Sequence, residues 1–96
     1  MSSSEDFSFT IDEGFSLQYM NVYKVLPGAA KCVVDVAADV DVVMAVNGEG
    51  NLLLGGDSIV LSVGDPIRVP RPAVYELESG ATRPFDVHVY GLRAEV

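Results

Sequence analysis

Hydrophobic residues alternate with polar residues along most of the chain, which is the period of a β-strand with one buried face. The alternation covers residues 7–11 and returns over residues 15–19, after a turn signal at residues 12–14. Its phase is lost at residues 20–22, where we expect a β-bulge or a change of sheet. A Leu-Pro-Gly sequence at residues 26–28 then closes this first segment.

The longest alternation follows, because every even position from residue 32 to residue 46 is apolar. The odd positions include Asp35, Asp39 and Asp41. The pattern predicts one face that is buried throughout and an opposite face that is acidic and solvated. Since this segment is long for one strand, we expect two strands with a turn or bend at residues 37–39, although one long bent strand crossing two sheets would keep the same phase.

The second half of the chain contains short apolar segments separated by turn residues. Asn-Gly-Glu-Gly at residues 47–50 predicts a tight hairpin, because Asn-Gly accepts positive φ angles. Pro70 and Pro72 remove two backbone donors and so predict a sheet edge or a loop. The strand candidates in this half are residues 52–54, 59–63, 67–69, 75–77 and 85–89.

Helical periodicity is absent from the sequence, and β-branched and aromatic residues dominate the periodic segments. The sequence therefore predicts an all-β fold, an antiparallel β-sandwich or jelly roll of about seven to eight short strands. A chain of 96 residues has room for one core, so we expect a single domain over residues 1–96, with residues 1–6 as a polar N-terminal arm.

The composition fits a folded, soluble domain, with 49% hydrophobic and 21% charged residues. Six Lys and Arg residues against fourteen Asp and Glu residues give a formal charge of −8. This charge opposes binding to nucleic acid or to an anionic membrane and is compatible with docking on a basic protein surface. The sequence shows no secretory signal and no apolar segment long enough to span a bilayer, so we expect a protein assembled in the cytosol.

Cys32 and His88 are the only residues of their types. One cysteine excludes an internal disulfide, and among valines Cys32 has the character of a small buried hydrophobe. One histidine cannot form a multi-histidine metal centre, and its alternation with valines places His88 on the face opposite the core. We therefore expect no catalytic residues, no metal and no cofactor.

Two groups of carboxylates have a structural and a functional interpretation. Asp35, Asp39 and Asp41 share a strand phase and could form an oxygen-rich calcium site, but the pattern favours a solvated acidic face because the calcium-loop motif is absent. Glu76 and Glu78 could act as a catalytic pair, but alternating glutamates are common on exposed strand faces.

Arginine and aromatic residues gather near the prolines that end one strand. Arg68, Arg71 and Tyr75 form the kind of cluster that anchors protein partners, and the alternative for the arginines, Arg83 included, is charge balance in an acidic chain. We hypothesise two partner-binding regions, the margin from Arg68 to Tyr75 and the N-terminal segment. The candidate residues of the N-terminal segment are Ser2, Ser3, Ser4, Phe7 and Phe9.

Residues 40–92 resemble the small β-sandwich proteins of tailed-phage virions, including capsid decoration or cement proteins. The resemblance rests on the Asn-Gly turn, the leucine-rich strands, Gly-Asp-Pro at residues 64–66 and the last strand at residues 85–92. It implies a non-enzymatic structural protein on the capsid surface, assembled in the host cytoplasm. Its partners would be a major capsid or other virion protein, with further copies of the chain in a homo-oligomer or symmetric lattice.

Residues 64–70, Gly-Asp-Pro-Ile-Arg-Val-Pro, resemble the cupins, in which a proline follows a glycine after five residues. A cupin would have a metal-binding histidine near Tyr75 and further histidines earlier, but this chain has none before His88. The resemblance therefore implies, as an alternative, a metal-free cupin-like small-molecule-binding protein or enzyme. Tyr75, Arg68 and Glu76 would lie in the mouth of its barrel.

Overall fold

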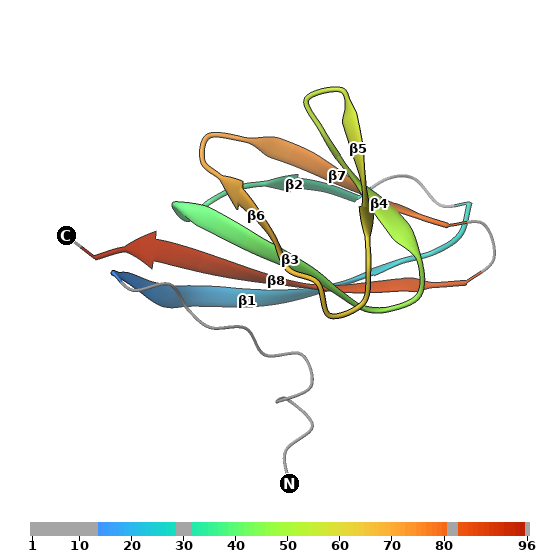
Figure 1. The fold of residues 1–96 in the computed structure, drawn as a ribbon, viewed down its shortest axis with the longest axis horizontal. Helices are drawn as coiled ribbons and strands as arrows, with labels where there is room; N and C mark the ends of the chain where they lie inside the picture. The colour runs from blue at the N-terminus through green and yellow to red at the C-terminus, as the bar shows by residue number, and fades with distance from the viewer. Residues whose placement is uncertain (1–13, 29–31, 81–82, 96) are drawn as a thin grey trace, which may run out of the picture.

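Two four-stranded antiparallel sheets face each other in the computed structural model, which describes residues 14–28, 32–80 and 83–95 (Figure 1). Sheet A has the order β1-β8-β3-β6 and sheet B the order β2-β7-β4-β5. The strands are β1 (Phe15–Val25), β2 (Cys32–Asp35), β3 (Val40–Asn47), β4 (Gly50–Leu54), β5 (Asp57–Leu61), β6 (Ile67–Pro70), β7 (Val74–Ser79) and β8 (Phe85–Ala94). The predicted all-β sandwich is confirmed.

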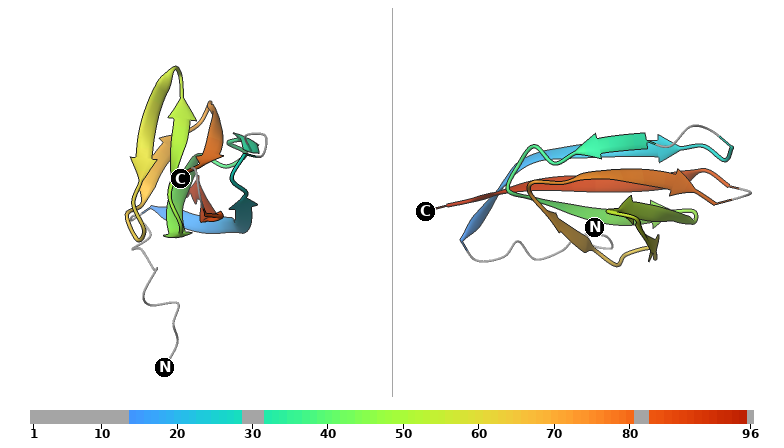
Figure 2. Two further views of the ribbon diagram at one scale, coloured as in Figure 1. Left: turned by 90° about the vertical axis from the view of Figure 1, so that its right-hand side faces the viewer. Right: turned by 90° about the horizontal axis from the view of Figure 1, so that it is seen from above.

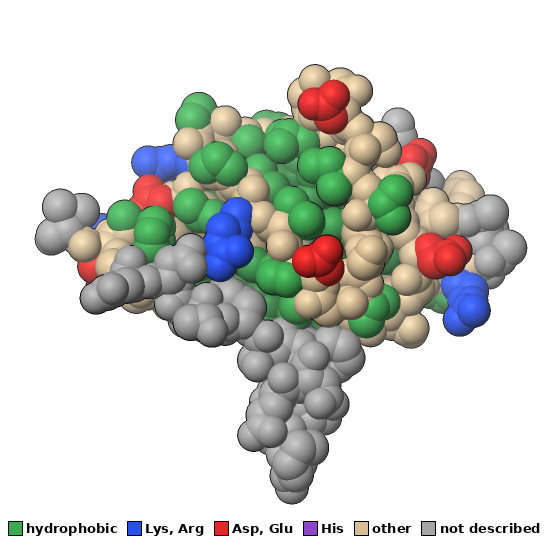
Figure 3. All heavy atoms as spheres, viewed as in Figure 1, with side chains coloured by type: hydrophobic (Ala, Val, Ile, Leu, Met, Phe, Trp, Pro, Cys, Tyr) green, Lys and Arg blue, Asp and Glu red, His purple; other side chains and the backbone are tan. Residues whose placement is uncertain are grey.

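Sheet B lies over sheet A, with the edge strands β1 and β2 along one side and β5 and β6 along the other (Figure 2). On the side of β5 and β6, apolar side chains gather between the two sheets (Figure 3). Half-buried residues that pack against the core from these strands and their neighbours include Leu54, Ile59, Ile67 and Ala73. Within the described ranges, no helix is long and apolar enough to cross a membrane.

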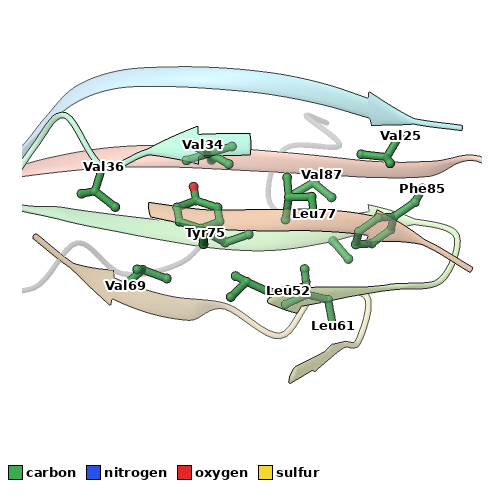
Figure 4. Close-up of a cluster of buried hydrophobic side chains, with 13 residues drawn as sticks. Val25, Val34, Val36, Leu52, Leu61, Val69, Tyr75, Leu77, Phe85 and Val87 are labelled. Atoms are coloured by element: carbon green, nitrogen blue, oxygen red, sulfur yellow. The ribbon is translucent and has the colours of Figure 1, made fainter. Parts of the chain in front are cut away.

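The core between the sheets is almost entirely aliphatic and aromatic (Figure 4). In β7 and β8 the odd-numbered residues point inward, as the alternation predicts, so that Tyr75, Leu77 and Phe85 are completely buried. The core cluster consists of Val25, Val34, Val36, Val43, Ala45, Leu52, Leu61, Val69, Tyr75, Leu77, Phe85, Val87 and Val89.

The two strands expected between residues 32 and 46 are present, and the even-numbered Val42 and Met44 of β3 are buried as predicted. The solvated odd-numbered face predicted for β3 is wrong, because this face is buried too and points to the core between the sheets. In β2 the even-numbered Val34 belongs to the core, whereas in β3 it is the odd-numbered Val43 and Ala45. The reason is that residues 36–39 carry the chain from sheet B to sheet A, and strands in facing sheets reach a common core with opposite surfaces. Asp41 therefore points into the core and does not belong to a solvated face.

The predicted hairpin at residues 47–50 is also wrong, because β3 belongs to sheet A and β4 to sheet B. The turn carries the chain from one sheet to the other. Gly48 has a φ of 84°, and an added Cβ would overlap the carbonyl oxygen of Pro84. A hairpin does form at Gly55 and Gly56, where β4 pairs with β5.

Two further expectations concern irregular positions. The edge predicted from Pro70 and Pro72 is confirmed, because β6 is an outer strand of sheet A. The β-bulge predicted at residues 20–22 lies earlier, between Leu17 and Tyr19, and brings Tyr19 opposite Gly91. A Cβ at Gly91 would overlap the Tyr19 ring, so the glycine leaves room for this aromatic side chain.

The expected strand at residues 7–11 and the N-terminal arm lie outside the described residues.

Candidate functional site

A carboxylate lies inside the sandwich, where Asp41 of β3 has no exposed surface. The Tyr19 hydroxyl donates to Asp41 Oδ1 at 2.7 Å, and the Tyr75 hydroxyl donates to Asp41 Oδ2 at 2.9 Å. These donors come from β1 and β7, so the cluster joins both sheets. A buried carboxylate needs such partners because it has lost its hydration. We call Tyr19, Asp41 and Tyr75 the core triad.

Burial determines the protonation of the two phenols. It raises the pKa of Tyr19 to about 12, and the hydrogen bond to Asp41 and the negative charge of Asp41 act in the same direction. Backbone hydrogen bonds from Ala38 and Ala37 lower this pKa in part. Burial and the Asp41 charge also raise the pKa of Tyr75. Both phenols therefore remain protonated donors at neutral pH.

Cys32 lies in β2, the edge strand of sheet B on the same side of the sandwich as β1 (Figure 2). It is half-buried and packs against the core, and burial raises the pKa of its thiol. The reactive form of cysteine is the thiolate, which a raised pKa disfavours. Burial likewise raises the pKa of Tyr23, with the charges of Cys32 and Asp41 adding to the effect.

A pocket of about 500 Å³ lies at one end of the sandwich, which we call the end pocket. It collects residues from β1, from the β2–β3 connection, from the β6–β7 turn and from the end of β8. Its lining residues are Gln18, Ala37, Ala38, Asp39, Arg71, Arg93 and Ala94. The end pocket therefore depends on four segments that are far apart in the sequence.

Asp39 holds these segments together. Its Oδ1 lies 3.5 Å from Arg71 Nη2, and its Oδ2 accepts a hydrogen bond from the Ala94 backbone N–H at 2.7 Å. Its backbone N–H donates to the Leu92 carbonyl at 3.0 Å, and its carbonyl accepts from the Arg71 N–H at 2.8 Å. The loop, the turn and the strand end are thus fixed around one aspartate.

The end pocket and the core triad are neighbours. Gln18 of the pocket precedes Tyr19, and the backbone of Ala37 and Ala38, which also lines the pocket, interacts with the Tyr19 hydroxyl. Two guanidinium groups and one carboxylate line the pocket, which makes its charged side chains net positive in an acidic chain. Arginine binds carboxylates and phosphates through a planar pair of N–H donors, so the pocket suits an anion.

The predicted margin around Arg68 and Tyr75 is not one surface. Arg71 lines the end pocket, and Arg68 is exposed on the outer side of β6. Tyr75 is completely buried in the core, because it occupies an inward position of β7. Glu76 points to the outer face of sheet B, so the barrel mouth expected from Tyr75, Arg68 and Glu76 does not form.

The hypothesised N-terminal contact region lies outside the described residues, so it stays a prediction. Its residues are Ser2, Ser3, Ser4, Phe7 and Phe9.

The acidic residues weighed for calcium do not converge. Asp35 is exposed on sheet B, Asp39 lines the end pocket and Asp41 lies in the core. His88 lies on the outer side of sheet A, where its Nδ1 is 3.4 Å from the Tyr90 hydroxyl. Across the described ranges, no three His, Cys, Asp or Glu residues are grouped to hold a metal ion. The described residues therefore do not fit a cupin-type metal site.

The pattern of the sequence did not identify Gln18, Tyr19 or Arg93 as site residues, and it raised Asp41 only as a candidate calcium ligand. Asp41 was assigned to the wrong face, and Arg93 follows the last alternating residues without a motif around it. One signal was present at Tyr19, where the alternation breaks next to the observed bulge. Bulges often redirect a side chain next to a functional site, so a lost phase marks positions to inspect.

No protein-family model and no curated protein sequence matches the chain. A crystal structure of a cupin protein from Bacteroides fragilis is similar to it, with a TM-score of 0.66 and 16% identity over 78% of this chain and 64% of that one. A putative mannose-6-phosphate isomerase from Ralstonia eutropha JMP134 gives a TM-score of 0.51 and 18% identity, covering 91% of this chain and 80% of that one. The fold is a cupin-like jelly roll.

These similarities revise two expectations from the sequence. Of the two resemblances, they support the one to cupins and give no support to the one to phage decoration proteins. The expectation of a non-enzymatic protein is contradicted, because a structural neighbour carries the name of an isomerase. At this level of identity the similarity shows the fold alone, and the chain spans 64% of the length of the Bacteroides fragilis protein.

Proposed function

We propose that this chain is a cupin-like domain that binds a small anionic molecule in the end pocket. The observation that carries the proposal is the meeting of Arg71 and Arg93 in one pocket of about 500 Å³. This volume lies in the usual range of small-molecule sites, which is about 300–1,000 Å³. Two residues of its lining, Ala37 and Ala38, also make backbone hydrogen bonds to Tyr19 of the core triad, which helps to fix this wall of the pocket.

The chemistry of the lining indicates how such a molecule is held. The two guanidinium groups supply paired donors to a phosphate or carboxylate, and the Gln18 amide supplies a donor and an acceptor for hydroxyl groups. Asp39 orients Arg71 through their ion pair. The overall charge of −8 disfavours long-range attraction of anions, but salt screens charges beyond about 8–10 Å, so the contacts within the pocket decide binding.

A phosphorylated sugar is the first ligand to test, since the Ralstonia eutropha neighbour is named for mannose 6-phosphate. Calorimetry would compare mannose 6-phosphate, inorganic phosphate and unphosphorylated mannose. We expect the two phosphorylated ligands to bind and mannose to bind at least about tenfold more weakly, because it lacks the group that pairs with arginine.

Arginine variants assign this binding to the end pocket. Arg71→Gln and Arg93→Gln are each expected to weaken binding of mannose 6-phosphate by about tenfold, which is about 1.4 kcal/mol. Arg83→Gln is the matched control, because Arg83 is exposed before β8, at the opposite end of that strand from Arg93. Equal affinity in the Arg71→Gln/Arg93→Gln double variant and the wild type would contradict the proposal.

Isomerisation of the bound sugar phosphate is a second candidate function. The observation that favours it is the carboxylate of Asp39 beside the two arginines, because moving a proton between adjacent carbons requires a base. Conversion of mannose 6-phosphate to fructose 6-phosphate would be measured in wild type and in Asp39→Asn, which keeps an acceptor for the Ala94 N–H. Turnover that is unchanged in Asp39→Asn would exclude Asp39 as this base.

A further inference from the structure

Sheet B has a strongly one-sided charge. Its four strands contain no lysine or arginine and carry four carboxylates, those of Asp35, Asp57, Glu76 and Glu78. The basic residues on described strands, Lys24, Arg68 and Arg93, all belong to sheet A. Among the strands, the net charge is therefore negative on sheet B and not on sheet A.

The same face carries exposed aliphatic side chains. Val33 is 62%, Val60 is 72% and Val74 is 55% exposed, and Leu53 is half-buried beside them. Single exposed valines are common, but these three belong to one sheet and lie among its carboxylates. We call the surface formed by Val33, Asp35, Leu53, Val74, Glu76 and Glu78 the acidic-aliphatic face.

Across this face, the pairing of the strands places carboxylate side chains next to aliphatic side chains. Glu76 of β7 lies between Val33 of β2 and Leu53 of β4, and Val74 lies opposite Asp35. Directly opposed residues have Cβ atoms about 4.5–5.5 Å apart. Each aliphatic side chain therefore has a carboxylate within the length of one lysine or arginine side chain.

A hollow of about 330 Å³ lies on this face, lined by Leu53, Val74 and Glu76 together with the β4–β5 turn and Ser58. Its walls combine apolar side chains with a carboxylate, and Asp57 lies at its rim. An arginine or lysine has a matching shape, because its hydrocarbon stem packs on aliphatic residues while its cationic head reaches a carboxylate.

We propose that the acidic-aliphatic face docks an extended segment of another protein, in which every second residue faces the sheet and these residues are alternately basic (arginine or lysine) and aliphatic. Charge complementarity selects this occupant, since a face with carboxylates and no strand lysine or arginine repels a second copy of itself. Residues i, i+2 and i+4 of an extended segment point to one side, with the same spacing as Val33 and Asp35 of β2 or Val74 and Glu76 of β7. This surface is separate from the end pocket and extends the function beyond small-molecule binding.

Fluorescence anisotropy with labelled synthetic peptides of about eight residues tests the proposal. In the first, the arginine-valine peptide, every second position is alternately arginine and valine, with serine at the positions between. The second has serine in place of each valine and therefore the same charge. We expect the arginine-valine peptide to bind at least tenfold more tightly, because only it fills the aliphatic rows. Equal affinities of the two peptides would show that binding depends on net charge alone, and this result would overturn the proposal.

Substitutions on sheet B and on sheet A then show where the peptide binds. Val33→Ser with Val74→Ser is expected to weaken the arginine-valine peptide about tenfold, and Val22→Ser is the matched control because Val22 of sheet A is also 62% exposed. Glu76→Gln should weaken binding, whereas Asp86→Asn on sheet A should not. Thermal melting checks that each variant folds.

Two results would overturn the proposal at this stage. One is unchanged affinity of the Val33→Ser/Val74→Ser protein. The other is sedimentation of the wild type as a dimer that this double variant dissociates, since a second copy would then occupy the face.

Discussion

At the scale of single residues, Asp41 is the most informative position of the molecule. It is a fully buried carboxylate held by two tyrosine hydroxyls, at 2.7 Å and 2.9 Å. All buried side-chain nitrogen and oxygen atoms of the described residues have hydrogen-bond partners, so the core tolerates this polar group. The buried carboxylate depends on the two tyrosine hydroxyls, because removing either one would leave a carboxylate oxygen without a hydrogen-bond donor.

Removing one of these donors should destabilise the fold. Tyr75→Phe deletes only the hydroxyl, and we expect the free energy of unfolding to fall by about 1–3 kcal/mol, because a buried charged acceptor loses its partner. Urea denaturation measures this loss. Tyr90→Phe on the outer side of sheet A is the control and should cost less than Tyr75→Phe, because Tyr90 is only half-buried and its hydroxyl does not partner a buried carboxylate. A loss in Tyr75→Phe no larger than in Tyr90→Phe would contradict the role of the core triad.

The raised pKa of Tyr19 predicts loss of stability in alkali. An unfolded tyrosine releases its proton near pH 10, whereas folded Tyr19 holds its proton up to about pH 12. Between these values the folded state binds more protons, so the free energy of unfolding falls as pH rises, by at most about 1.4 kcal/mol per pH unit for this one group. The stabilisation is fully present below pH 10.

Denaturation at pH 9 to 12 tests this expectation, with Tyr19→Phe as the comparison. Burial also raises the pKa of Tyr23 and Tyr90, so part of the alkaline slope will remain in the variant. The slope should be shallower in Tyr19→Phe than in the wild type. Identical slopes in the two proteins would show that Tyr19 does not hold its proton more tightly on folding.

At the scale of elements, the connection between β3 and β4 determines how the two sheets close on each other. It has the residues of a hairpin turn, but it crosses between sheets and lies against the start of β8. Gly48 approaches Pro84 so closely that a side chain has no room there. The glycine is therefore required by packing between distant segments as well as by its positive φ.

Alanine substitutions at Gly48 and Gly56 can separate the effect of a positive φ from the effect of close packing. Gly56 has a φ of 89° and no atom within 4 Å of an added Cβ, whereas Gly48 has a φ of 84° and meets Pro84 and Phe85. Gly56→Ala should cost about 1–2 kcal/mol from backbone strain, and Gly48→Ala about 1–3 kcal/mol more from overpacking. Thermal melting of both variants measures the difference, and equal losses would contradict the close approach.

At the scale of the whole molecule, charge is divided between the two layers. The strands of sheet B carry carboxylates without lysine or arginine, while sheet A carries the strand lysine and arginines. The end pocket lies where the sheet A strand end and two connections bring Arg71 and Arg93 together. One acidic chain thus presents a cationic pocket and an acidic face in different places, which suits two different partners.

This division predicts that salt stabilises the protein. Repulsion among the carboxylates of sheet B is screened at high ionic strength, so raising NaCl from about 0.02 to 0.5 M should increase Tm by several degrees. The double variant Glu76→Gln/Glu78→Gln should show a smaller increase. Asp86→Asn is the control, because Asp86 lies 3.8 Å from Lys24 and is compensated. An equal response in all three proteins would place the repulsion elsewhere.

The local structure can be predicted from the sequence alone. Period-two alternation identified the strands β7 and β8 and their inward residues, and Pro70 marked the edge strand β6. These features depend on neighbouring residues, because backbone geometry alone sends successive side chains to opposite faces.

Three features follow only from the fold: which face of β3 points to the core between the sheets, which turn crosses between the sheets, and which distant residues meet. Tyr19 and Tyr75 reach Asp41 from 22 and 34 residues away, and the end pocket joins four segments. Alternation cannot show that the odd-numbered face of β3 is buried as well, because this depends on the sheet to which the strand pairs, and pairing is a long-range interaction.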